Sequence, residues 1–142
     1  MADTDKLSFK HLDITSRIVG AFFAVYGELG YGFLESVYRS AMGIALREAG
    51  LNVRDEVAAR ARFRGHCVGL FRLDFVVEHA VIVELKGARG IDQCHLAQVL
   101  NYLRCTSLET GLILNFGRKQ VIPLISSAFS AFICGPLLPG HR

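Results

Sequence analysis

The sequence predicts an α/β fold in which one mixed sheet is flanked by helices. Three observations lead to this prediction. Two stretches with apolar residues at helical spacing come first, short apolar runs separated by turns occupy the middle, and a further helical stretch precedes a last apolar run. The order helix, three strands, helix, strand is typical of a mixed sheet with helices on its faces.

The length and composition favour a single domain that spans residues 1–142. Hydrophobic residues make up 51% of the chain and charged residues 20%, which excludes long disorder. The net charge of +3 permits an anionic partner without requiring one. The four cysteines lack CxxC spacing, which favours reduced thiols over a zinc knuckle or a disulfide framework. Because the first ten residues also lack the apolar run of a signal peptide, we expect a cytoplasmic protein.

Two helices are expected in the first third of the chain. Apolar residues recur at steps of three and four from about Asp13 to Tyr26, and Gly27 and Gly30 mark the end of this helix. The second helix is expected to begin near Phe33. It ends at Gly50, where a left-handed cap is expected.

The middle of the chain predicts three strands joined by tight turns. They are expected at residues 53–63, 68–77 and 80–85, with turns at 64–66 and 78–79. The continuous apolar run from Val81 to Val83 is typical of a buried strand. A helix is expected at about 92–104, followed by a strand at 111–116.

Residues 121–140 contain no charged residue, and this segment has two interpretations. Its length just suffices to span a membrane, but Pro123, Pro136 and Pro139 divide it into short pieces. We therefore expect no membrane association. The preferred interpretation is an edge strand followed by a short apolar helix at about 126–134, which covers the core or forms a homodimer contact.

Glu84 and Lys86 are the most informative polar residues, because they lie on one face of an apolar strand. Burying both groups is costly unless each is paired or binds something. A hairpin at residues 78–79 brings Asp74 near Glu84, and two carboxylates this close repel each other unless a cation lies between them. A hard divalent ion such as Mg²⁺ meets that requirement. The alternative is a salt bridge between Glu84 and Lys86, with Asp74 capping a turn.

Further polar residues lie on the predicted helices. Gln98 and Tyr102 are four residues apart on one face, which brings an amide and a phenol to the same cleft. Glu35 lies near the start of the second helix, where the helix dipole also favours a merely solvated glutamate.

These residues together resemble a known family. The pattern Gly32-x-x-Glu35-x-x-Tyr38, then Asp74, Glu84-x-Lys86 and Gln98-x-x-x-Tyr102, is similar to the family named for its GxxExxY motif, a branch of the PD-(D/E)XK nuclease superfamily. The resemblance implies a restriction-endonuclease-like α-β-β-β-α-β core over about residues 14–124. An extra N-terminal helix precedes this core, and an apolar extension at about 125–142 follows it.

The resemblance also implies roles for individual residues. Asp74, Glu84 and the main-chain carbonyl of Leu85 would bind Mg²⁺ or Mn²⁺, and Lys86 would position the attacking water or stabilise developing charge. Glu35 would bind the metal through water or orient Lys86. Gln98 and Tyr102 would line the active site, and His95 matches a histidine that often precedes this pair.

The expected activity is divalent-metal-dependent hydrolysis of phosphodiester bonds in nucleic acid, with DNA favoured as the substrate. Arginine and lysine residues on the predicted strands and loops supply a basic rim for phosphates. The alternative is a nucleic-acid-binding or oligomerisation module that keeps the nuclease fold without turnover.

Overall fold

The computed structural model describes residues 2–120, 122–126 and 129–134, with side chains described for 11–120 and 122–126. The helices and strands follow in this order: α1 (Ala2–Leu29), α2 (Glu35–Glu48), β1 (Val53–Phe63), β2 (His66–Val77), β3 (Val81–Lys86), α3 (Gln93–Cys105), β4 (Thr110–Asn115), β5 (Leu124–Ser126) and β6 (Phe129–Cys134). The strands form one sheet in the order β1-β2-β3-β4-β5-β6. The predicted α/β class and order of elements are confirmed.

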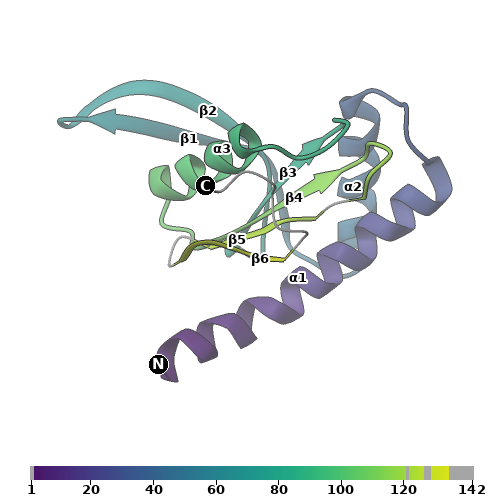
Figure 1. Ribbon diagram of the computed structural model, residues 1–142, viewed down its shortest axis with the longest axis horizontal. Coiled ribbons are helices and arrows are strands. Elements are labelled where there is room, and N and C mark those ends of the chain that lie inside the picture. Colours follow the sequence, from purple (N-terminus) through teal and green to yellow (C-terminus); the bar gives the residue numbers. More distant parts are fainter. Residues whose placement is uncertain (1, 121, 127–128, 135–142) are drawn as a thin grey trace.

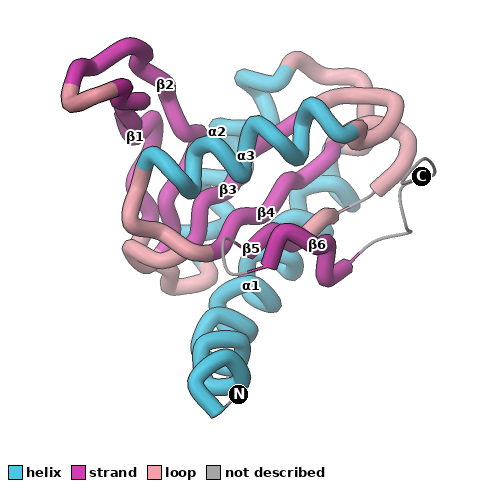
Figure 2. Tube along the Cα trace, turned by 60° about the vertical axis from the view of Figure 1, so that its left-hand side comes forward, coloured by secondary structure: helices cyan, strands magenta, loops and turns pink. Residues whose placement is uncertain are grey.

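The sheet is mixed and lies between two layers of helices (Figure 1). β3 and β4 are parallel, whereas the other neighbouring pairs of described strands are antiparallel. A parallel pair needs a crossover connection, and α3 provides it. Figure 2 shows α3 in front of the sheet and α2 behind it, while α1 runs from behind the sheet to a position below it.

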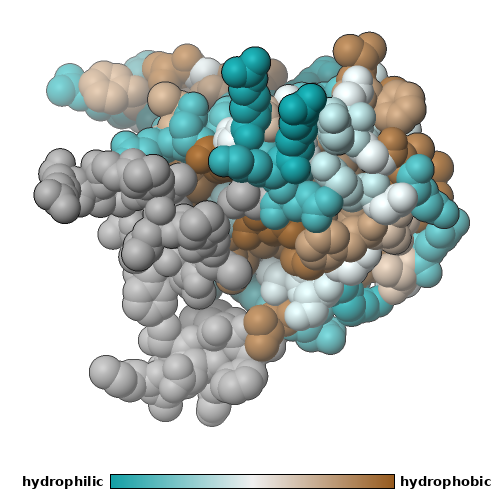
Figure 3. Space-filling view, turned by 45° about the vertical axis from the view of Figure 1, so that its right-hand side comes forward, coloured by the Kyte–Doolittle hydropathy of each residue, from teal (hydrophilic) through white to brown (hydrophobic). Residues whose placement is uncertain are grey.

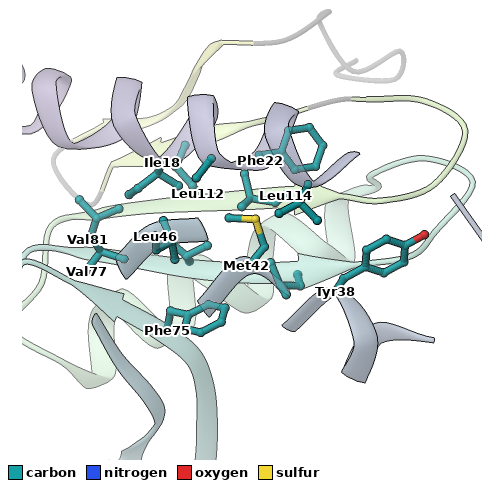
Figure 4. Packing of buried hydrophobic residues seen from close by; sticks show 14 of the residues in the cluster. Ile18, Phe22, Tyr38, Met42, Leu46, Phe75, Val77, Val81, Leu112 and Leu114 are labelled. Atoms are coloured by element: carbon teal, nitrogen blue, oxygen red, sulfur yellow. The ribbon is translucent and has the colours of Figure 1, made fainter. Parts of the chain in front are cut away.

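The main core lies between the sheet and the α1–α2 pair. Ile18 and Phe22 of α1 and Met42 and Leu46 of α2 are fully buried and face apolar side chains of the strands (Figure 4). Strand residues alternate between the two faces, so that Val81, Val83 and Leu85 join this core while Ile82 joins the α3 side, which is a second core. The predicted buried strand is thus confirmed.

Helix α3 approaches β4 very closely. A Cβ placed on Gly111 would lie 2.6 Å from Cγ1 of Val99, so the helix lies directly on the backbone of the strand at this point. The distance between α3 and β4 therefore depends on the absence of a side chain at Gly111 as well as on the large apolar residues around it.

Strands β1 and β2 form a long hairpin that extends beyond the rest of the sheet (Figures 1 and 2). Its tip has positive φ at Arg64 (49°) and Gly65 (81°), and the next turn has positive φ at Glu78 (55°) and His79 (53°). Positive φ at both central residues is the requirement of a type I′ hairpin turn. Both turns lie where the sequence predicts them.

The N-terminal helix is longer than predicted. It begins at Ala2, whereas the apolar periodicity predicts a start near Asp13. A long-range contact supports its middle, because Nδ1 of His11 lies 2.6 Å from Oγ1 of Thr110 on β4. A tertiary contact of this kind has no signal in the local sequence pattern.

The predicted helix at 126–134 is wrong. Phe129–Cys134 forms strand β6, which pairs antiparallel with β5. A short apolar run does not distinguish a helix from a strand, and here the open edge of β5 offers hydrogen-bonding groups that a strand satisfies. Residues 135–142 of the predicted extension lie outside the described residues. No helix in the described ranges is both long and apolar enough to cross a membrane.

Candidate functional site

The candidate site lies where β2 separates from β3. Their register pairs Phe75 with Val83 and continues only toward the turn, while β2 runs on with β1 as the projecting hairpin. Beyond this point, two side-chain carboxylates accept the hydrogen bonds that backbone N–H groups of β2 and β3 would otherwise donate across the pair. The backbone N–H of Asp74 donates to Oε1 of Glu84 (3.0 Å), and the N–H of Leu85 donates to Oδ2 of Asp74 (2.8 Å). The structure thus brings together the two acidic residues that the sequence singles out.

Arg39 of α2 completes this pair of acids. Its Nε and Nη2 atoms donate to Oδ1 of Asp74 at 3.0 Å and 2.9 Å, so both carboxylate oxygens of Asp74 have partners. The Asp74 side chain is 13% exposed and that of Arg39 is 33% exposed, which makes this a partly buried ion pair. Arg39 is not among the predicted site residues. Its spacing of four residues from Glu35, on the same helix face, is the signal that points to it.

Glu84 has a strongly perturbed carboxyl group. It is 4% exposed, and burial together with the negative charge of Asp74 raises its pKa from 4.5 to about 8. The N–H of Asp74 and the ammonium of Lys86 act in the opposite direction but do not compensate. Near neutral pH the carboxyl of Glu84 therefore retains a proton unless a cation stabilises its charged form.

Lys86 and Glu35 lie at the rim of the site. Lys86 is the half-buried last residue of β3 and forms no ion pair with any carboxylate in the described part of the chain. Its charge nevertheless acts on Glu84. Oε1 of Glu35, at the first position of α2, accepts a hydrogen bond from the N–H of Gly87 (3.3 Å). Glu35 thus contacts the residue after Lys86, not the Asp74–Glu84 pair.

Gln98 and Tyr102 form a hydrogen-bonded pair on α3. Nε2 of Gln98 donates to the hydroxyl of Tyr102 (2.7 Å), whose ring packs against Phe71 of β2. Burial raises the pKa of Tyr102, and the charge of Glu84 raises it further, so the phenol lies within electrostatic reach of the carboxylates. His95 instead caps the start of α3 in a reciprocal pair with Asp92.

Gly32 and Tyr38 build the turn that carries Glu35. Gly32 has a φ of 110°, which L side chains rarely adopt. The buried hydroxyl of Tyr38 donates to the carbonyl of Gly30 (2.6 Å) and accepts from the N–H of Phe33 (3.2 Å), which closes the connection between α1 and α2. The Tyr38 ring stacks on Phe116 at 4.2 Å. These two residues therefore hold the start of α2 against the ends of β3 and β4.

The donor set fits Mg²⁺ or Mn²⁺ bound partly through substrate and water. Within the described residues no three His, Cys, Asp or Glu side chains cluster as a complete metal site. Mg²⁺ commonly binds through only one or two protein carboxylates and completes its shell with waters and substrate phosphates. Asp74 and Glu84 supply that number of carboxylates, and the pKa of Glu84 is raised first by burial and then by the negative charge of Asp74, both of which a bound cation would offset.

The fold and the paired acids at diverging strands define an α/β protein with a restriction-endonuclease-like core. The family model of the PD-(D/E)XK nuclease superfamily matches residues 12–124, and the chain belongs to this superfamily. The crystal structure of SSO0001 is similar in fold, with a TM-score of 0.50 and 16% identity over 88% of this chain. The match covers 58% of SSO0001, so the present chain corresponds to part of that protein. The search of curated proteins finds no match.

Proposed function

We propose that this protein hydrolyses phosphodiester bonds in nucleic acid with a divalent metal. The observation that carries the proposal is the pair of carboxylates at the point where β2 and β3 separate, with Lys86 two residues beyond Glu84. Membership of the nuclease superfamily supports the same reaction class. The order Gly32, Glu35, Tyr38, which runs from the turn before α2 into its first turn, supports the finer assignment to the GxxExxY family.

Each residue has a proposed role. Asp74, Glu84 and the main-chain carbonyl of Leu85 would bind Mg²⁺ or Mn²⁺, which supplies charge stabilisation and lowers the pKa of a bound water. Lys86 would orient the attacking water or stabilise charge on the phosphate. Glu35 holds the backbone after Lys86, while the hydrogen-bonded pair of Gln98 and Tyr102 would contribute polar groups within electrostatic reach of Glu84 and Asp74.

The experiment is cleavage of labelled single- and double-stranded DNA and RNA with Mg²⁺ or Mn²⁺, with EDTA as the metal-free arm. Asp74→Asn keeps the shape of the side chain but removes its charge, and we expect it to reduce cleavage at least about 100-fold. Asp55→Asn is a matched control. Asp55 also lies on the long hairpin and also pairs with an arginine of α2, because Arg47 Nη2 is 2.9 Å from its Oδ1.

The result decides between two candidate functions. Metal-dependent cleavage that is lost in Asp74→Asn and kept in Asp55→Asn supports the nuclease. The second candidate is a nucleic-acid-binding module, which the ion pair between Arg39 and Asp74 favours because it satisfies the acid without metal. Binding without cleavage under every metal condition would favour the module.

The proposal extends to the substrate of the protein, its oligomeric state and its cellular location. We propose that the chain forms a single nuclease-like domain that acts on DNA in the cytoplasm. We also propose a homodimer through the apolar extension at 125–142, where β6 is the last strand of the described sheet. Light scattering during size-exclusion chromatography tests the dimer directly, and a monomer at all concentrations would contradict it.

A further inference from the structure

A groove next to the carboxylates has features that the metal chemistry does not use. The loops after β3 and β4 and the connection between α1 and α2 enclose a volume of about 820 Å³, which we call the loop groove. Its lining includes the buried Phe116 and five further large side chains, Tyr31, Phe33, Arg89, Arg118 and Lys119. Figure 1 shows these three segments at one end of the molecule, opposite the tip of the β1–β2 hairpin.

The loop groove adjoins the rim of the candidate site. Gly87 follows Lys86 in the chain and lines the groove, and its N–H donates to Oε1 of Glu35. A nucleic-acid strand bound in the groove would therefore lie beside the last residue of β3.

Asn115 fixes the two loops relative to each other. It is fully buried at the end of β4, and its Oδ1 accepts from the N–H groups of Ala88 (3.0 Å) and Gly117 (3.2 Å). Its Nδ2 donates to the carbonyls of Ala88 and Lys119, both at 3.0 Å. With four hydrogen bonds from one side chain, the groove is pre-formed rather than assembled on binding.

The charge of the groove suits a polyanion. Arg89, Arg118 and Lys119 are exposed, and none of them forms an ion pair with a carboxylate among the residues that the structure describes. Among the described residues that line the groove, none is acidic. Three cations without acidic partners favour phosphate groups, which lie at regular intervals along a nucleic-acid strand.

The aromatic residues distinguish an unpaired strand from a duplex. Tyr31 and Phe33 are each 53% exposed. The Arg118 guanidinium lies 5.3 Å from the centre of the Tyr31 ring, and the edge of Phe33 packs on Tyr38. Figure 3, with this end turned forward, shows hydrophilic side chains projecting beside hydrophobic surface. Exposed rings beside cations are the usual platform for stacking unpaired bases.

We propose that the loop groove binds an unpaired segment of nucleic acid, with bases stacked on Tyr31 and Phe33 and phosphates held by Arg89, Arg118 and Lys119. The inference rests on the proposed function for its biological meaning, since it names a single-stranded substrate for the adjacent site. Binding itself is measured without metal and without hydrolysis, so the two proposals can fail separately.

The test is fluorescence anisotropy of a labelled single strand of about 20 nucleotides and of its blunt duplex, both in EDTA. The double variant Tyr31→Leu with Phe33→Leu keeps apolar bulk but removes the stacking surface. We expect it to weaken single-strand binding about tenfold or more and duplex binding less than about twofold. Arg118→Ala with Lys119→Ala should weaken both and reduce the salt dependence of binding.

A matched control uses the far end of the molecule. At the hairpin tip the Arg64 guanidinium lies 4.9 Å from the Phe63 ring, so Phe63→Leu with Arg64→Ala removes a similar cation–aromatic pair. An equal loss of single-strand binding in this control would overturn the proposal. So would wild-type preference for the duplex, or unchanged single-strand binding in the leucine variant.

A direct probe is available because the chain contains no tryptophan. Phe33→Trp places a single indole in the groove, and stacking on a base should quench its fluorescence with the single strand but not with the duplex. If these binding patterns appear without any cleavage, the hydrolysis proposal fails and the groove stands. If the protein cleaves but the indole does not respond, the groove proposal fails alone.

Discussion

Asp74 and Glu84 each satisfy a backbone N–H that is left without a ladder partner where β2 and β3 separate. Their function as hydrogen-bond acceptors and their proposed function as metal ligands therefore depend on the same geometry. Arg39 balances one negative charge, and a retained proton balances the other. Without metal, the Arg39 guanidinium and the proton on Glu84 thus offset the negative charges of the two carboxyl groups. A divalent cation would take over this role.

Glu84→Gln should stabilise the protein in EDTA at pH 8. The unfolded chain ionises this carboxyl near pH 4.5, whereas the folded protein keeps the proton until about pH 8. The folded state binds more protons between these values, so the free energy of unfolding falls as pH rises across this window. We expect a gain on the order of a few kcal/mol at pH 8 that vanishes near pH 4.5.

The measurement is thermal unfolding by circular dichroism at several pH values. Glu109→Gln serves as the control, because Glu109 is exposed just before β4. A Tm difference between Glu84→Gln and wild type that does not grow with pH would contradict the assigned burial of the charge.

Arg39→Met should make stability depend more strongly on metal. The variant keeps an apolar stem but removes the only ion-pair partner of Asp74 in the described structure. We expect a loss of about 1–3 kcal/mol in EDTA, because the Asp74 carboxylate loses its two contacts with Arg39 and keeps only the hydrogen bond from the N–H of Leu85. Excess Mg²⁺ should restore much of this loss. The readout is Tm with EDTA and with Mg²⁺.

Arg47→Met is the matched variant for this comparison. Arg47 and Asp55 are about half exposed, with side-chain exposures of 50% and 48%, and such pairs contribute about 0–1 kcal/mol. Equal losses in the two variants, or no added response to Mg²⁺ in Arg39→Met, would show that Arg39 does not act as the countercharge.

The sequence predicts which residues share the site better than it predicts their partners. Period two places Glu84 and Lys86 on one face, and a hairpin at Glu78 brings Asp74 opposite Glu84. Arg39 escapes this reasoning because its contact crosses from a helix to a strand 35 residues away. Such pairings depend on how the layers pack, which periodicity does not specify.

The loops after β3 and β4 are held together by hydrogen bonds to one buried side chain, that of Asn115. Asn115→Ala should destabilise the protein by about 2–4 kcal/mol, because it leaves the backbone groups of two loops without partners in a buried place. Asn101→Ala is the control, since Asn101 is exposed and accepts one bond from Arg104. Urea unfolding gives both values, and similar losses would contradict the bridging role of Asn115.

The predicted helices and strands are correct where the hydrophobic periodicity and the length of the segment indicate the same type of element. Both hairpin turns lie between runs of strand-like residues, and β3 contains a continuous apolar run, so their predicted positions are correct. The segment at 129–134 fails because an apolar run of six residues fits either a helix or a strand, and only the neighbouring edge of β5 decides. The early part of α1 fails for a similar reason, since its contact with Thr110 lies far along the chain.

In the whole molecule, the candidate site and the loop groove lie near one end of the sheet, and the hairpin projects from the other. The strands separate at the carboxylates, the loop groove opens beside them, and the long hairpin extends away toward the opposite end (Figure 1). The groove reaches the rim of the proposed metal site at Gly87, whereas the carboxylates of Glu84 and Asp74 lie deeper, with exposures of 4% and 13%.

Metal binding should therefore stabilise the whole fold in a way that depends on both acids. A ligand that binds only the folded state raises stability by about 2.7 kcal/mol at 100 times its dissociation constant. We expect Mg²⁺ or Mn²⁺ to raise the Tm of the wild type at neutral pH, and EDTA to reverse the rise. Asp74→Asn and Glu84→Gln should abolish it, whereas Asp55→Asn should keep it, because its ion pair with Arg47 lies away from Glu84. A rise of the same size in Asp74→Asn would place the bound metal elsewhere and remove the basis for assigning hydrolysis to this pair of carboxylates.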